Sequence, residues 1–143
     1  MTFDELTNTV PNGFHDSELN RLEMDYLTRK LVFDVLVFTG GVDNPQKVQM
    51  YRPARVTVEN VAYLVIEPPD PREPPDPSYP WVEAGGISFD TGEGQPSQSA
   101  SILPTAPEGT TVTWMYLYDF NRFLLFAAGD ATLEWTGPEE DRN

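Results

Sequence analysis

The chain of 143 residues contains no cysteine and only one histidine, His15. The absence of cysteine excludes disulfide bonds and any mechanism that uses a thiol of this chain. Every histidine-dependent reaction must use His15. A chain without disulfides is typical of a reducing compartment, so we expect a cytoplasmic protein.

Long hydrophobic runs are also absent. The longest apolar stretches fall far short of the ~20 residues that a membrane helix needs. The first twenty residues hold neither the basic nor the apolar region of a secretory signal. We therefore expect no secretory signal and no membrane partner.

Basic residues are scarce: nine Lys and Arg face 23 Asp and Glu, which gives a net charge of −14. Residues 61–143 hold three basic and fourteen acidic residues, a net charge of −11. Such a chain lacks the basic surface that nucleic-acid binding needs, so no nucleic-acid partner is expected. It would attract a protein partner with a basic surface, unless the charge serves solubility alone.

What is present is enough apolar sequence for one folded domain, residues 1–143. Alternating apolar and β-branched residues predict a set of strands, with a bend near Asn60 in the third. The expected strands are 18–26, 31–38, 54–67, 81–89, 110–120, 123–128 and 131–135. The fold class is therefore mainly β, an antiparallel sandwich or partly open barrel of six or seven strands with little helix.

The remaining segments are predicted as connections. Residues 1–10 form a peripheral arm, with a short helical turn as an alternative, and residues 136–143 form a polar tail. The proline-rich stretch 68–80 is an extended strap, or a linker that a proline-binding groove could recognise. Residues 90–110 form a long loop, and Gly85 and Gly86 indicate a bulge or a close backbone approach.

His15, Asp16 and Ser17 are neighbours, which raises the question of a catalytic triad. Adjacent side chains on an extended segment point to opposite faces, so His15 and Asp16 would not touch. We therefore assign no catalytic residue. We expect Asp16 and Ser17 to bind backbone N–H groups where the sheet begins, while His15 packs against Phe14 or Tyr26.

No cofactor motif is present. Metal-ligand spacings such as HExxH or a calcium loop are missing, and residues 90–94 (DTGEG) lack both a ligand series and a phosphate-binding pattern. The sequence predicts no metal and no cofactor. A pair of carboxylates for glycoside hydrolysis stays open, since the required separation is spatial.

Three aromatic residues, Trp114, Tyr116 and Tyr118, alternate with Met115 and Leu117 in the sixth expected strand. If Met115 and Leu117 face the core, the aromatic face is either a binding platform or a second buried face of a sandwich. Both interpretations are open at this point.

The segment NGFHDSELNRLEMDY, followed by LVFDVLV, resembles the N-terminal pattern of an uncharacterised family of small bacterial proteins. In that family an HDS-type segment leads into a β-hairpin. Some members are similar to immunity proteins of bacterial toxin systems. The stretch YRPARVTVENVAYLVIEPPDP is similar to the middle of one such family. The resemblance implies a binding role and transfers no catalytic residue.

Two functions follow as hypotheses. The first is a non-enzymatic protein-binding module, immunity-like, that covers a basic partner surface. The second is a small-molecule or carbohydrate site, binding or hydrolytic, with His15 at its rim and the aromatic residues as a wall. The candidate binding residues are His15, Asp16, Trp114, Tyr116 and Tyr118. Whether the protein is oligomeric stays open, and we expect substitution of His15 to change stability more than activity.

Overall fold

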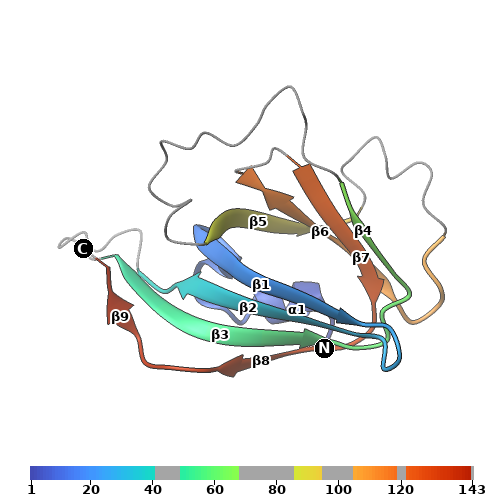
Figure 1. The fold of residues 1–143 in the computed structure, drawn as a ribbon, viewed down its shortest axis with the longest axis horizontal. Coiled ribbons are helices and arrows are strands. Elements are labelled where there is room, and N and C mark those ends of the chain that lie inside the picture. The colour runs from blue at the N-terminus through green and yellow to red at the C-terminus, as the bar shows by residue number, and fades with distance from the viewer. Residues whose placement is uncertain (41–48, 68–85, 95–104, 119–121, 143) are drawn as a thin grey trace.

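The computed structural model describes residues 1–40, 49–67, 86–94, 105–118 and 122–142. The described residues form nine strands, one α helix and one 3-10 turn (Figure 1). The helix is α1 (Phe3–Thr7) and the turn is η1 (Pro11–Phe14). The strands are β1 (Ser17–Asp25), β2 (Lys30–Phe38), β3 (Met50–Val58), β4 (Tyr63–Ile66), β5 (Ile87–Glu93), β6 (Thr111–Leu117), β7 (Arg122–Ala128), β8 (Ala131–Trp135) and β9 (Glu140–Asp141).

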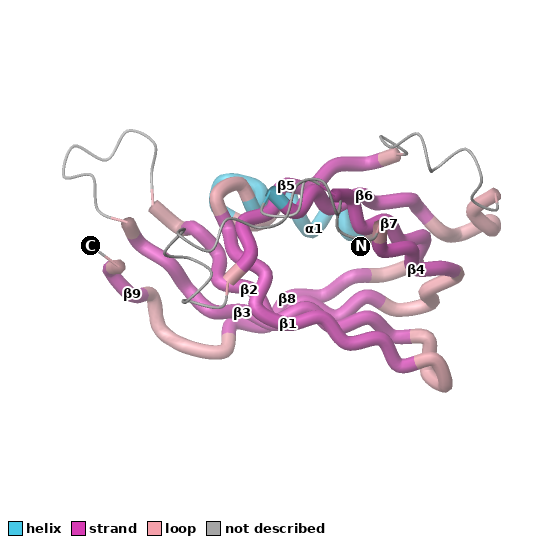
Figure 2. Tube along the Cα trace, turned by 45° about the horizontal axis from the view of Figure 1, so that its top comes forward, coloured by secondary structure: helices cyan, strands magenta, loops and turns pink. Residues whose placement is uncertain are grey.

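All strands belong to one antiparallel sheet, in the order β4-β7-β6-β5-β1-β2-β3-β8, with β9 on β3. The sheet curls so that β5, β6 and β7 face β1, β2, β3 and β8, but it does not close into a barrel (Figure 2). The predicted fold class, mainly β and antiparallel with little helix, is confirmed. The described strands number nine where six or seven were expected, because one expected strand is divided and the end of the chain adds another.

The bend expected near Asn60 divides the third predicted strand into β3 and β4. Asn60 has φ +53°, and β3 and β4 lie in different halves of the sheet. The turn between β7 and β8 crosses beside it. Glu59 N donates to Asp130 O at 2.8 Å and Gly129 N donates to Glu59 O at 2.9 Å. Two crossing connections therefore bind the two halves of the sheet together at one end.

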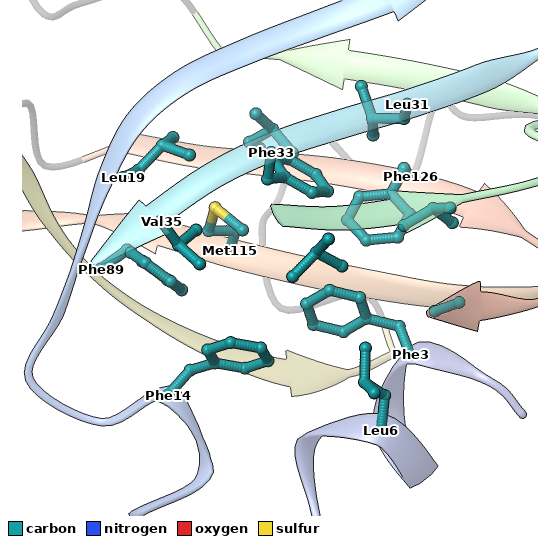
Figure 3. Packing of buried hydrophobic residues seen from close by; sticks show 14 of the residues in the cluster. Phe3, Leu6, Phe14, Leu19, Leu31, Phe33, Val35, Phe89, Met115 and Phe126 are labelled. Atoms are coloured by element: carbon teal, nitrogen blue, oxygen red, sulfur yellow. The ribbon is translucent and has the colours of Figure 1, made fainter. Parts of the chain in front are cut away.

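The core is rich in aromatic side chains that meet between the two halves (Figure 3). In β2 the alternation of Leu31, Phe33, Val35 and Val37 places all four in the core. The apolar run of β7 lacks alternation and is buried on both faces from Leu124 to Ala128, as predicted. Burial of these apolar side chains is the main favourable contribution to folding.

The first ten residues are not the peripheral arm that was predicted. Thr2 and Glu5 form a capping box that starts α1, and Phe3 is only 3% exposed. The Phe3 ring lies 5.4 Å from that of Phe126, and Met1 O accepts a hydrogen bond from Ala131 N at 2.7 Å. The reason is that a curled sheet without full closure exposes core residues, which the apolar face of α1 covers.

The predicted boundary between a strand at 81–89 and a loop at 90–110 is wrong as well. Strand β5 continues from Ile87 to Glu93, into the expected loop, because β6 offers partners as far as the pair Glu93 and Thr113. Residues 81–85 of the expected strand, and 95–104 of the expected loop, lie outside the described residues. The proline-rich strap at 68–80 does so too.

The polar tail at 136–143 is likewise more than a tail. Glu140 and Asp141 form β9, which pairs with Met50 and Tyr51 of β3. Arg52 Nε donates to Gly137 O at 3.0 Å, and Thr39 Oγ1 donates to the Glu139 carboxylate at 2.6 Å. The polar composition gave no sign of this pairing, since backbone groups carry most of it.

Candidate binding site

The segment around His15 is a tight turn with an unusual backbone. Asn12, Gly13, Phe14 and Asp16 all have φ between +58° and +66°. The Asn12 side-chain amide donates to Phe38 O at 3.2 Å, which fastens the turn to the end of β2. This backbone sends the Phe14 ring into the core and leaves the two following side chains outside.

His15 and Asp16 lie on the surface, with side chains 63% and 64% exposed. Their Nε2 and Oδ2 atoms are 3.7 Å apart, so the expectation that they would not approach each other is wrong. That expectation assumed an extended segment, whereas Asp16 has φ +61°. Packing of His15 against Tyr26 is also wrong, because Tyr26 is at the opposite end of β1 and is itself 84% exposed.

Ser17 behaves as predicted. Its side chain is fully buried, and its Oγ accepts a hydrogen bond from Phe38 N at 3.1 Å. The hydroxyl therefore points away from the exposed His15 imidazole. These three neighbours do not form a nucleophile, base and orienting acid, which need mutual contact in that order.

A hollow of about 260 Å³ opens on the outer face of β5, β6 and β7. We call it the aromatic hollow; it is lined by Asp90, Trp114, Tyr116, Tyr118 and Phe123. Asp90 lies opposite Tyr116 in the β5–β6 ladder, and Phe123 lies opposite Tyr116 in the β6–β7 ladder. His15, expected at the rim of such a site, is not among these lining residues.

The rings of the aromatic hollow contact one another. Trp114 and Phe123 have centroids 5.7 Å apart at an interplanar angle of 83°, and Tyr116 lies 5.0 Å from both Phe123 and Tyr118. Edge-to-face and tilted arrangements of this kind are favourable contacts between aromatic rings. The four rings therefore form one continuous aromatic wall.

The two faces of β6 differ in their exposure to solvent. Met115 and Leu117 are buried in the core, whereas Trp114 and Tyr116 are half-buried and Tyr118 is 51% exposed. The expected alternation is thus present. The aromatic face borders a solvent-accessible hollow, which favours the binding platform over a second buried face.

A second hollow, of about 360 Å³, lies nearby on β1, β2, β3 and β5. We call it the acidic hollow; its lining residues are Asp16, Glu18, Phe38, Gln49, Tyr51 and Ser88. Glu18 and Ser88 are directly opposite each other in the β1–β5 ladder. Asp90 follows Ser88 by two residues and so shares its face of β5, which places the two hollows side by side.

One tyrosine in each hollow, Tyr51 and Tyr118, has a side-chain pKa above its ordinary value. Burial, followed by the negative charges of Glu18 and Asp16, raises the pKa of Tyr51. Burial, followed by the charges of Asp90 and Asp16, raises the pKa of Tyr118. Asp16 thus acts on both hollows, since a nearby negative charge disfavours a phenolate. Asp16, one of the candidate binding residues, lines the acidic hollow.

Sequence reasoning found three of the five residues of the aromatic hollow. Their period of two was sufficient for Trp114, Tyr116 and Tyr118. Asp90 and Phe123 depend on the register of β5 and β7 against β6, which no local pattern encodes. Glu18 and Tyr51 of the acidic hollow were missed for the same reason.

Within the described ranges, no three acidic or histidine side chains gather where they could hold a metal ion. Across the same residues, no helix combines the length and apolar content that crossing a membrane would take. Comparison of the chain with protein-family models, with curated proteins and with solved structures finds no match.

Proposed function

We propose that this protein is a non-enzymatic binding module whose aromatic hollow receives a side chain from a basic protein partner. The observation that supports it is the aromatic wall of Trp114, Tyr116 and Phe123 beside the carboxylate of Asp90. Exposed aromatic side chains in a hollow are the usual energetic centre of a protein interface. A carboxylate at the edge favours a cationic group.

The net charge of the chain supports a basic partner. At −14 it attracts a positively charged surface over a distance of about one Debye length, which raises the association rate at low salt. Asp16 and Asp90 supply local negative charge beside β1 and on β5. An anionic partner would be repelled by the same groups.

The immunity-like role is the specific form of this proposal. A neutraliser that covers a basic surface of a toxin needs an acidic face with an apolar anchor, and the aromatic hollow provides both features. The resemblance of residues 12–26 to the HDS-type family is the reason to name this form. Within residues 12–26, Phe14 and Ser17 are buried and stabilise the fold.

The test starts with capture of partners from the native host by wild-type protein, Trp114→Ala and Tyr26→Ala. Tyr26 is the matched control, an exposed aromatic residue in the β1–β2 turn. The captured partner is then purified and its affinity measured by calorimetry at low and high salt. Folding of each variant is checked by thermal unfolding.

We expect a basic partner whose affinity falls by at least about 2 kcal/mol, roughly thirtyfold in Kd, with Trp114→Ala. Tyr26→Ala should bind as the wild type does, and high salt should weaken binding. Equal binding of the partner by wild-type protein and Trp114→Ala would reject the proposal. A partner that is acidic, or that binds independently of salt, would do the same.

A carbohydrate ligand is the second candidate, because aromatic rings beside a carboxylate also suit sugar recognition. Rings stack on the apolar face of a sugar while Asp90 accepts its hydroxyl hydrogen bonds. Neutral sugars bind with little dependence on salt, so the two candidates separate in the same assay. A panel of neutral oligosaccharides titrated into wild-type protein and Trp114→Ala tests it. Loss of affinity in Trp114→Ala supports the carbohydrate candidate. If none of the oligosaccharides binds, this candidate is rejected.

A further inference from the structure

The carboxylate of Glu18 in the acidic hollow is built into the fold. Its side chain is only 16% exposed, and Gly86 lies so close that a Cβ there would be 2.5 Å from Glu18 Oε2. The close approach expected at the glycine pair is thus present at Gly86. A carboxylate held in this way is costly to leave without a positive partner.

Arg142 supplies that partner. Its Nη1 donates to Glu18 Oε2 at 3.0 Å, and its guanidinium carbon lies 5.4 Å from the centroid of the Tyr51 ring. The guanidinium is therefore held by a carboxylate on one side and by an aromatic face on the other. This combination suits arginine better than lysine, because the planar guanidinium stacks on rings.

The attachment of Arg142 to the rest of the fold is short. Its N–H donates to Gln49 O at 2.9 Å, and the preceding strand, β9, has only two residues at the edge of β3. Most of the segment from Glu139 to Arg142 is exposed. Short, exposed edge segments open at low free-energy cost compared with the core of a sheet.

We infer that Glu18 and Tyr51 form an arginine subsite of the proposed binding surface, and that Arg142 occupies it until an arginine side chain of the partner protein replaces it. The inference rests on the proposed function. It extends the interface from the aromatic hollow, across Asp16, to the acidic hollow. The bound Arg142 shows which chemical group this subsite accepts.

An internal occupant lowers the apparent affinity of an external one. The observed dissociation constant equals the intrinsic constant divided by the fraction of molecules in which the subsite is open. If Arg142 occupies the subsite in nine-tenths or more of the molecules, its removal strengthens binding of an external arginine by about tenfold or more. Removal of a positive charge elsewhere on the surface should have a far smaller effect.

The experiment uses N-acetyl-arginine methylamide as the probe and its lysine counterpart as the comparison. Both are titrated into wild-type protein, Arg142→Ala and Arg21→Ala, with NMR of labelled tyrosine and backbone amides as the readout. Arg21→Ala is the matched control, because Arg21 forms an exposed ion pair with Glu23 and its loss changes the net charge equally. A double variant, Arg142→Ala with Glu18→Gln, removes the carboxylate from the open subsite.

We expect Arg142→Ala to bind the arginine probe about tenfold or more tightly than wild type or Arg21→Ala, with shifts centred on Tyr51. The lysine probe should bind less tightly, and the double variant should lose the gain. Equal affinity of Arg142→Ala and Arg21→Ala would overturn the inference, as would shifts that avoid Tyr51. Thermal unfolding and the NMR spectra of β3 establish that each variant is folded.

The experiments can reject the two proposals independently of each other. If the partner requires Trp114 but Arg142→Ala gains no affinity for the arginine probe, the arginine subsite is rejected and the proposed function stands. If the partner binds without Trp114 while Arg142→Ala gains affinity for the probe, the proposed function is rejected and the assignment of an arginine-binding subsite stands. With both confirmed, Arg142→Ala should also bind the partner protein more tightly than wild type.

Discussion

The indole ring of Trp114 occupies the space that a side chain on Gly92 would need. The two residues are opposite each other in the β5–β6 ladder, and a Cβ on Gly92 would lie 2.6 Å from the indole Nε1. Glycine at this position therefore allows the indole to lie against the backbone of β5. The aromatic hollow depends on this contact, because Trp114 forms one of its walls.

Gly92→Ala should displace the Trp114 ring and lower the free energy of unfolding by about 1–3 kcal/mol, as overpacking usually does. The measurements are urea unfolding and the near-ultraviolet circular dichroism of the indole. Ser88→Ala, on the same strand and face, is the control and should stay within about 0.5 kcal/mol of wild type. An unchanged near-ultraviolet spectrum for Gly92→Ala would contradict the packing of Trp114.

Ser17→Ala should destabilise the protein by about 1–3 kcal/mol, because the Phe38 N–H would lose its buried acceptor. His15→Ala should change stability by less than about 0.5 kcal/mol, since the imidazole is exposed. The expectation from the sequence was a change in stability larger than any change in activity, and the exposed imidazole predicts that the change in stability is small. Chemical unfolding of both variants side by side is the measurement, and a larger loss of stability for His15→Ala than for Ser17→Ala would contradict the exposed position of the imidazole.

Phe3→Ala should lower the free energy of unfolding by about 3–5 kcal/mol, the usual effect of removing a buried aromatic ring. Phe3 contacts Phe14, Phe33 and Phe126, so its loss opens a cavity between the two halves of the sheet. Asn8→Ala, an exposed change at the end of α1, is the control. Thermal and urea unfolding would measure the stability of both variants. A loss of stability for Phe3→Ala as small as that for Asn8→Ala would show that residues 1–10 are peripheral.

Asp25→Asn should change how stability depends on pH. Asp25 Oδ1 accepts N–H groups of Leu27 at 2.9 Å and Thr28 at 3.2 Å. The hydrogen bonds with Thr28, then that with Leu27 and the charge of Lys30, hold the pKa of Asp25 below its ordinary value of 3.8. Folding therefore favours the ionised form, and this contribution is present above pH 3.8 and lost as pH falls through the folded-state pKa.

The melting temperature of wild type should thus exceed that of Asp25→Asn at neutral pH, and the two curves should converge below pH 3.8. Thermal unfolding across the acid range measures the difference. Glu108→Gln removes an exposed carboxylate on the turn before β6 and serves as the charge control. A difference for Asp25→Asn that persists unchanged into strong acid would show that the carboxylate charge is not the cause.

Several strands could be predicted because their sequence pattern is local. Alternation of apolar side chains identified β1, β2 and β6, and the unbroken apolar run identified β7 as buried on both faces. The same period of two placed Trp114 and Tyr118 on one face. These features arise within a few residues, where side-chain direction follows from backbone geometry.

Features that depend on a distant partner could not be predicted. Strand β9 forms because β3 offers unpaired backbone groups to Glu140 and Asp141, and α1 is buried because the curled sheet leaves an opening. The contact of His15 with Asp16 needed the left-handed backbone of Asp16, which is rare outside glycine. A prediction that assumed an extended segment could not anticipate this contact.

The sequence by itself determined the mainly β class, the faces of its most regular strands and the strongly negative charge, since each follows from composition or short-range periodicity. Only the tertiary structure decided that Asp90 and Phe123 meet Tyr116, and that Arg142 reaches Glu18 across 124 positions of the chain. Those pairings are set by the register of strands and by the curl of the whole sheet. The physical reason is that register minimises the free energy of the complete hydrogen-bonded ladder and core, to which every strand contributes.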